Sequence, residues 1–143
     1  MNELFSLLSN TAQLEANKKL LVIFFRGAWC VHCKKQLQDF ELHRGEFERA
    51  NIQLLGVAPD TKFKLSLLKN FLRLSFPLLA DENFSLIDAL DLRTVYKEHT
   101  TSKPAIILFN QVGDIIHQEV ATDYDDRTSA RATLEQITPL LWN

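Results

Sequence analysis

Hydrophobic and polar positions divide the chain into short apolar runs and longer amphipathic stretches. Residues 20–25 form a continuous apolar run, whose Val, Ile and Phe content suits a strand buried on both faces. Residues 52–58 and 105–110 predict two further strands. Residues 115–120 predict a fourth strand, which pairs with the third as a hairpin across a turn at residues 111–114.

Helical spacing of apolar residues separates these strands. It predicts helices over residues 2–16, 30–49, 61–73, 82–90 and 128–141. Residues 76–80 form a short extended piece, and Asp81 after it can cap the next helix. Strands that alternate with helices and end in a hairpin predict an α/β fold with a mixed central sheet and helices on both faces.

Length and composition favour one compact domain over residues 1–143, of which 46% are hydrophobic and 24% charged. A formal net charge of −2 gives no basic excess for nucleic acid and no charge field for a membrane surface. The longest apolar run is too short to span a bilayer, and residues 1–5 lack the features of a signal peptide. Two cysteines exclude a multi-disulfide scaffold, so the expected compartment is a reducing cytoplasm.

Both cysteines lie in the segment Trp-Cys-Val-His-Cys at residues 29–33, directly after a buried strand and at the start of a helix. Sulfurs at positions i and i+3 share one helical face and can form a disulfide. Cys30 would lie at the helix N-terminus, where free N–H groups favour a reactive thiolate. Lys34 and Lys35 add positive charge nearby.

Three other interpretations of the cysteine pair fit the sequence less well. Two buried, inert thiols are disfavoured because both cysteines fall in one C-x-x-C after a strand. A zinc site could use Cys30, His32, Cys33 and a distant histidine, but zinc ribbons bring a second ligand pair at matching spacing. Covalent haem needs histidine after the second cysteine, where Lys34 stands. We therefore expect no metal and no organic cofactor.

At these residues the chain resembles thioredoxin-like proteins, and more closely the redoxin and peroxiredoxin-like branch of the alkyl hydroperoxide reductase/thiol-specific antioxidant superfamily. Three stretches carry the resemblance: residues 24–37 around the cysteines, Phe-Pro-Leu-Leu-Ala-Asp at 76–81, and Lys-Pro-Ala-Ile at 103–106. The resemblance covers about residues 18–120. It implies a thioredoxin-like three-layer sandwich and thiol-dependent redox chemistry.

Several positions depart from the family pattern. Val31 replaces the proline common between the cysteines, and Phe24 stands where thioredoxins often hold a buried acid. Gly27 stands three residues before Cys30, where peroxiredoxins place a Thr or Ser before the peroxidatic cysteine. Thr-Ser-Lys at 101–103 occupies the region of the peroxiredoxin arginine. The groups that polarise a peroxide are therefore incomplete, and Arg26 is the candidate to substitute for part of them.

The resemblance assigns a role to each residue of the candidate site. Cys30 is the expected nucleophile and Cys33 the resolving thiol, with these roles reversed if the substrate is a peroxide. As a cation, His32 would stabilise a neighbouring thiolate, or else it is an exposed loop residue. Trp29 would shape the docking surface or be structural. Pro104 is expected to be cis and to lie against the disulfide, with an ordinary trans proline as the alternative.

Other apolar and histidine positions have plainer interpretations. His43, His99 and His117 have no partner readable from the sequence and are expected to be surface or half-buried residues. A further apolar set is expected mostly in the core, and an excess of it would mark a homodimer contact: Phe63, Leu67, Leu68, Phe71, Leu72, Phe76, Leu78 and Leu79.

The leading hypothesis is a cytoplasmic thiol–disulfide oxidoreductase that uses the Cys30/Cys33 couple. The second hypothesis is a peroxiredoxin-like thiol peroxidase with Cys33 or Cys30 as the peroxidatic thiol. The third is a non-enzymatic redox sensor whose disulfide changes a docking surface. In each case the electrons would come from a dithiol protein or a low-molecular-weight thiol, and the substrate would be a protein disulfide or a hydroperoxide.

Overall fold

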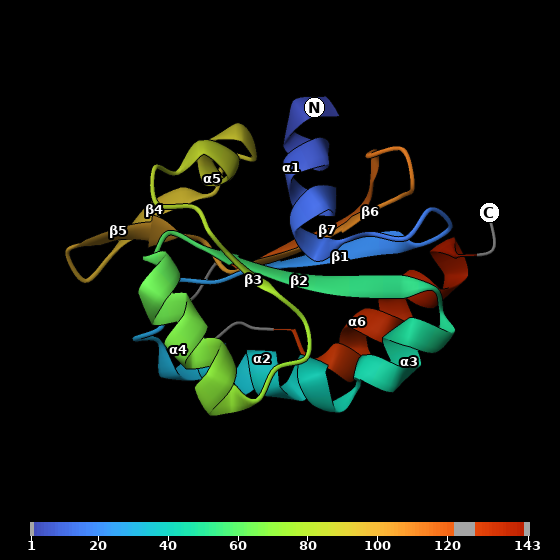
Figure 1. The fold of residues 1–143 in the computed structure, drawn as a ribbon, viewed down its shortest axis with the longest axis horizontal. Coiled ribbons are helices and arrows are strands. Elements are labelled where there is room, and N and C mark those ends of the chain that lie inside the picture. Colours follow the sequence, from blue (N-terminus) through green and yellow to red (C-terminus); the bar gives the residue numbers. More distant parts are fainter. Residues whose placement is uncertain (1, 122–127, 142–143) are drawn as a thin grey trace.

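The computed structural model describes residues 2–121 and 128–141 of the chain (Figure 1). In chain order the elements are α1 (Asn2–Ala12), β1 (Lys19–Phe24), α2 (Val31–Leu42), α3 (Arg44–Arg49), β2 (Ile52–Ala58), α4 (Lys62–Leu72), β3 (Leu78–Ala80), α5 (Ser85–Ala89), β4 (Arg93–Tyr96), β5 (His99–Ser102), β6 (Ala105–Phe109), β7 (Ile115–Val120), α6 (Ala130–Ile137) and a 3-10 turn (Thr138–Leu140).

A five-stranded sheet in the order β3-β2-β1-β6-β7 forms the centre of the fold. The β1–β2 and β2–β3 pairs are parallel, and the β1–β6 and β6–β7 pairs are antiparallel. Figure 1 shows α2, α3, α4 and α6 on one side of this sheet and α1 and α5 on the other. The predicted three-layer α/β architecture with a mixed sheet is confirmed.

The central strand β1 separates two apolar clusters, one on each face of the sheet. Leu21 and Ile23 belong to the cluster that also contains both cysteines. Leu20 and Val22 belong to the cluster under α1 and α5. All four side chains are fully buried, which confirms the prediction of a strand covered on both faces.

The predicted helix over residues 30–49 is divided into α2 and α3 at His43. The φ and ψ angles of His43 are −97° and 11°, outside the helical range. Its ring Nδ1 lies 2.9 Å from the carbonyl oxygen of Asp39, so a side chain competes for an acceptor of the last turn. Phe40 and Phe47 still stack across the break, with ring centroids 5.5 Å apart.

One hairpin is absent from the sequence prediction. Strands β4 and β5 pair antiparallel, with Tyr96 opposite His99. The two residues between them, Lys97 and Glu98, have φ angles of 45° and 71°. Such a turn usually contains Asn-Gly or Asp-Gly, so its sequence gave no hairpin signal.

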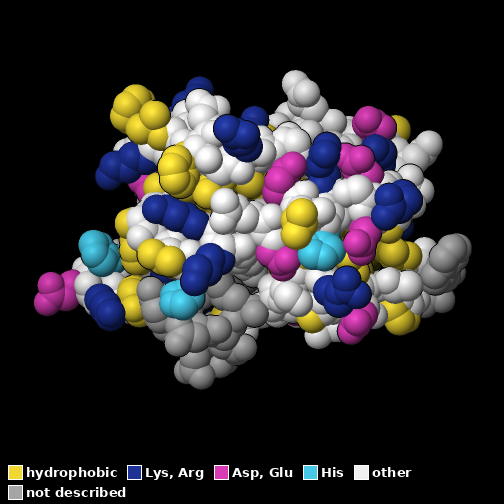
Figure 2. Space-filling view, turned by 90° about the horizontal axis from the view of Figure 1, so that it is seen from below, with side chains coloured by type: hydrophobic (Ala, Val, Ile, Leu, Met, Phe, Trp, Pro, Cys, Tyr) yellow, Lys and Arg dark blue, Asp and Glu magenta, His cyan; other side chains and the backbone are white. Residues whose placement is uncertain are grey.

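The helix α4 is the clearest correction to the predicted core. Leu68 and Leu72 are buried as expected, but Phe63, Leu67 and Phe71 are exposed. Figure 2 shows the face formed by α2, α3, α4 and α6, where hydrophobic and basic side chains alternate over the left half. In residues 2–121 and 128–141, no helix has the length and apolar character needed to cross a membrane.

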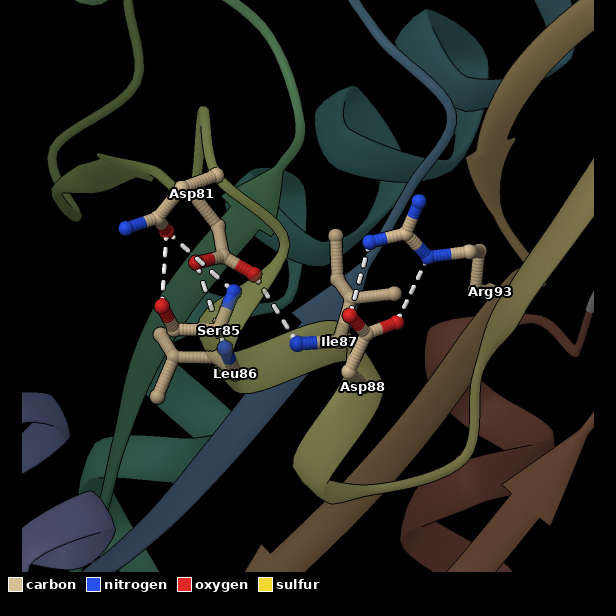
Figure 3. Close-up of polar contacts among 7 residues, drawn as sticks. Asp81, Ser85, Leu86, Ile87, Asp88 and Arg93 are labelled. Atoms are coloured by element: carbon tan, nitrogen blue, oxygen red, sulfur yellow. Dashed lines mark hydrogen bonds and ion pairs between the residues drawn. The ribbon is translucent and has the colours of Figure 1, made fainter.

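Asp81 confirms the predicted capping of the following helix, although α5 begins later than expected, at Ser85. The carboxylate of Asp81 accepts the backbone N–H of Leu86 at 3.2 Å and that of Ile87 at 2.9 Å (Figure 3). Further along, Arg93 donates two hydrogen bonds of 2.7 Å to Asp88. These bonds lower the pKa of the Asp88 carboxyl and raise the pKa of Arg93.

Candidate active site

The loop between β1 and α2 brings the cysteines to the carboxyl end of the central strand. Gly27 is required there, because a Cβ atom would lie 2.5 Å from Nε1 of the Trp29 indole. The backbone N–H of Ala28 donates to Oδ2 of Asp60 at 2.9 Å, which ties this loop to the end of β2. The loop conformation therefore depends on a close approach of the indole and on one partly buried hydrogen bond, from Ala28 to Asp60.

Cys30 occupies the N-cap position of α2, with φ −89° and ψ 114°. Its Sγ accepts the backbone N–H of Cys33 at 3.3 Å, and the two sulfur atoms lie 2.6 Å apart. The Sγ of Cys33 accepts the backbone N–H of Arg26 at 3.4 Å. Both residues are thiols and almost fully buried, with exposed fractions of 1% and 0%. The helix N-terminus and the backbone N–H of Cys33 favour negative charge on the sulfur of Cys30.

The β4–β5 hairpin supplies residues that the sequence did not point to. Thr101, 1% exposed, donates its hydroxyl to the carbonyl oxygen of Arg26 at 2.7 Å. The guanidinium of Arg26 lies 4.2 Å from the ring centroid of Tyr96, and Arg26 is itself buried. The hairpin thus holds both the backbone and the side chain of the residue that donates to Cys33.

Trp29 stacks against the same hairpin. Its ring centroid lies 6.2 Å from that of Tyr96 and 5.0 Å from that of His99, with interplanar angles of 11° and 26°. The indole remains 42% exposed beside the cysteines. His99, expected to be a surface or half-buried residue, is exposed as expected and also takes part in the aromatic stack. His32, between the two cysteines, is half-buried.

The structure corrects the expectation for Pro104, because the described residues contain no cis peptide bond. The trans form is the lower-energy isomer of an X–Pro bond, and hydrogen bonds hold the extended chain on both sides. Lys103 donates its N–H to Leu92, and the carbonyl of Pro104 accepts the N–H of Ala121. Pro104 is buried and lines a small cavity with Gln36, one turn after Cys33 on α2.

Two other histidines have partners away from the sulfurs. The imidazole of His117 lies 3.1 Å from a carboxylate oxygen of Glu119, and that of His43 lies 3.4 Å from Asp39. Within the described residues, no group of three or more His, Cys, Asp or Glu side chains is arranged to hold a metal ion. The reactive groups that the structure brings together at this site are the sulfurs of Cys30 and Cys33.

A dithiol at the start of the helix after the first central strand, on a mixed sheet of this topology, defines a thioredoxin-like protein. The sequence matches the AhpC/TSA family over residues 6–118, and the chain belongs to this family. A provisionally named peroxiredoxin of Mycobacterium tuberculosis is 32% identical over 72 residues, which are 50% of this chain and 46% of that protein.

Two further comparisons widen the range of similar proteins. The thiol-disulfide oxidoreductase ResA of Halalkalibacterium halodurans is 25% identical over 103 residues, or 71% of this chain and 54% of ResA. The chain thus spans about half the length of the curated relatives it matches. The structure of the Xanthomonas campestris bacterioferritin comigratory protein superposes with a TM-score of 0.77 at 18% identity, covering 88% of this chain and 82% of that one. This likeness concerns the fold.

Proposed function

We propose that the protein is a thiol-dependent oxidoreductase that exchanges disulfides through the Cys30/Cys33 couple. One observation carries the proposal: Cys30 Sγ, at the N-cap of α2, accepts the backbone N–H of Cys33 and lies in direct contact with Cys33 Sγ. A thiolate is the attacking species in disulfide exchange, and this sulfur is the better placed of the two to carry the charge.

The reaction proceeds in two steps. The Cys30 thiolate attacks one sulfur of the substrate disulfide, forms a mixed disulfide and releases the other sulfur as a thiolate. Cys33 then loses its proton and attacks Cys30 Sγ, which expels the second substrate thiolate and leaves a Cys30–Cys33 disulfide. Two electrons pass to the substrate. A dithiol protein or a low-molecular-weight thiol returns the couple to the reduced state by the reverse exchange.

The burial of the two sulfurs fits their different roles in this reaction. Cys33 is fully buried, but its attack on Cys30 is internal and needs no access from solvent. Cys30 is 1% exposed, so a substrate sulfur reaches it only after neighbouring groups move. We expect that movement at the segment just before Cys30 and at the hairpin that stacks on Trp29, because these lie at the surface beside the pair.

A thiol peroxidase is the second candidate, and membership in the AhpC/TSA family favours it. In this reaction a thiolate at Cys33 attacks the peroxide oxygen, becomes a sulfenic acid and releases an alcohol or water. Cys30 then attacks the Cys33 sulfur, water leaves, and the same disulfide forms. The Arg26 N–H, which donates to Cys33 Sγ, would stabilise that thiolate. We also propose a reducing compartment such as the cytoplasm, where cellular thiols would return the Cys30/Cys33 couple to the dithiol state between turnovers.

Rapid mixing separates the two candidates. A Trp142→Phe background leaves Trp29 as the single indole, whose fluorescence reports the state of the adjacent pair. Disulfide exchange predicts fast oxidation by hydroxyethyl disulfide and a rate with hydrogen peroxide no higher than that of a free thiolate. Cys33→Ser should then accumulate the mixed disulfide on Cys30, seen as a mass increase. Fast oxidation by peroxide with a sulfenic acid on Cys33 in Cys30→Ser would establish the peroxidase instead.

A further inference from the structure

Three exposed apolar side chains form a ridge along α4. Phe63, Leu67 and Phe71 are 72%, 54% and 79% exposed. Their spacing of four residues places them on one face of the helix, while the opposite face is buried in the core. We call these three residues the α4 ridge. Contiguous exposed apolar groups of this kind mark binding surfaces in proteins more often than chance positions do.

The α4 ridge is continuous with the cysteine site. A groove of about 410 Å³ runs between α4 and the start of α2. Leu67, Leu68 and Phe71 line it from α4, and Ala28 and Lys34 line it from the other side. Ala28 stands two residues before Cys30, and Lys34 directly follows Cys33. A molecule seated in this groove therefore contacts residues that flank the dithiol on both sides in the sequence.

Basic residues predominate along α4, and the one carboxylate among the described residues that contacts its backbone is that of Glu82, which accepts the N–H of Lys62 at 3.2 Å. Residues 61–73 contain Lys62, Lys64, Lys69 and Arg73 and no acidic residue. In the described part of the chain, none of these four cations, nor Lys34, forms an ion pair with a carboxylate. The alternation of hydrophobic and basic side chains on the left of Figure 2 follows this arrangement. The face is thus apolar and basic together, in a protein whose net charge is −2.

We propose that the α4 ridge docks an acidic protein partner, whose apolar side chain enters the groove and whose disulfide or dithiol then meets Cys30. The proposal rests on the disulfide exchange proposed above. Charge argues for this occupant over a second copy of the chain, because a symmetric contact would set the same cations against each other. Shape argues for a protein over a lipid surface, because a groove accepts a protruding side chain.

Matched disulfide peptides test the partner's chemistry. One peptide carries Glu, Leu and Phe around its disulfide, the second replaces Glu by Lys, and the third replaces Leu and Phe by Ser. Each rate of reduction by the full-length dithiol protein is divided by the rate for hydroxyethyl disulfide. We expect the acidic, apolar peptide to exceed the basic one by about tenfold at low salt, and the preference to shrink at about 1 M salt. The acidic peptide without apolar residues should also be slower.

Substitutions on the α4 ridge test whether the peptide preference arises at this surface. Lys64→Glu should lower the acidic-to-basic ratio, and Phe71→Ser should lower the advantage of the apolar peptide. Leu42→Ser and Arg49→Glu are matched controls, because both residues are exposed and lie at the other end of α2 and on α3. Both controls should behave as the wild type.

The possible results distinguish a failure of the docking proposal from a failure of the proposed disulfide exchange. No reduction of hydroxyethyl disulfide would defeat the proposed function itself. Reduction of that compound with equal ratios for all three peptides would defeat the docking proposal alone. Two other results would also overturn it: a wild-type dimer in sedimentation that Phe71→Ser dissociates, or binding to phosphatidylglycerol vesicles that Phe71→Ser abolishes.

Discussion

The starts of α2 and α5 are both stabilised by a side-chain acceptor, but the accepting atom is sulfur in one helix and oxygen in the other. Both helices follow a strand of the central sheet, and in both a side chain accepts backbone N–H groups of the first turn. At α5 the acceptor is the carboxylate of Asp81, which binds the N–H groups of Leu86 and Ile87 (Figure 3). At α2 the acceptor is the sulfur of Cys30, which binds the N–H of Cys33.

The difference between the two acceptors decides what each helix start can do. A carboxylate has no thiol-type redox chemistry, so Asp81 can only stabilise its turn. A thiolate gains the same stabilisation from the helix N-terminus, yet it can leave that state by forming a covalent bond to another sulfur. The same arrangement therefore gives stability at α5 and reactivity at α2. Each prediction below tests one side of this contrast.

Cys30→Ser should have the largest effect, and it should fall on activity. Serine is a good N-cap residue, so the helix start is kept and the free energy of unfolding should change by less than about 1 kcal/mol. Disulfide exchange should fall by more than about a hundredfold, because the hydroxyl stays protonated at neutral pH. Single-turnover exchange and urea unfolding measure the two quantities. If Cys30→Ser lowered the free energy of unfolding by much more than about 1 kcal/mol, the contrast between a stabilising and a reactive helix start would not hold.

Asp81→Ala should show the opposite pattern. Asp81 is 5% exposed, and its removal leaves two backbone N–H groups of α5 without their acceptor. We expect a loss of about 2 kcal/mol in the free energy of unfolding. Asp81→Asn keeps one oxygen acceptor and should lose less. Exchange rates of the folded variants should stay near the wild-type value, and a slower exchange in Asp81→Asn would mean that α5 acts on the thiols.

Thr101→Val tests how firmly the hairpin holds the sulfurs. The substitution keeps the side-chain shape but removes the hydroxyl that donates to the carbonyl of Arg26. Because that carbonyl is buried with Arg26, unfolding should become easier by about 1 kcal/mol. The rate at which iodoacetamide alkylates Cys33 in a Cys30→Ser background should also change, since Arg26 donates to its sulfur. Thr100→Val, exposed on the same strand, is the control and should leave both values unchanged.

The sequence was sufficient for the parts of the fold that local pattern specifies. The apolar run of β1, the hairpin β6–β7 and the place of Cys30 at the start of α2 all follow from periodicity and from the position of the cysteines after a strand. The β4–β5 hairpin did not follow, because Lys97 and Glu98 adopt left-handed conformations that such residues seldom take. Because this hairpin was not predicted, the contact of Thr101 with Arg26 and the aromatic partners of Trp29 were not predicted either.

The exposure of α4 could not be predicted for a different reason. Its sequence is apolar on both faces, with Leu65, Leu68 and Leu72 on one and the α4 ridge on the other. Periodicity shows which residues are apolar, but only the sheet beneath decides which face is covered. Pro104 shows a third kind of limit: the family pattern implied a cis bond, and the peptide bond before Pro104 is trans.

The smallest expected effect concerns the Asp88–Arg93 pair, which joins the end of α5 to the start of β4 (Figure 3). Because Arg93 lowers the pKa of Asp88 below its ordinary value of 3.8, the pair contributes stability above that pH. The contribution is lost as the pH falls through the lowered pKa. Arg93→Gln should therefore unfold at a slightly lower urea concentration than the wild type at about pH 7, and the gap should narrow as the pH falls through the lowered pKa. Since the hairpin beyond Arg93 stacks on Trp29, exchange rates of the same variant show whether this exposed pair also affects the thiols. A gap that widened on acidification would contradict the assignment of the stabilisation to an ionised Asp88.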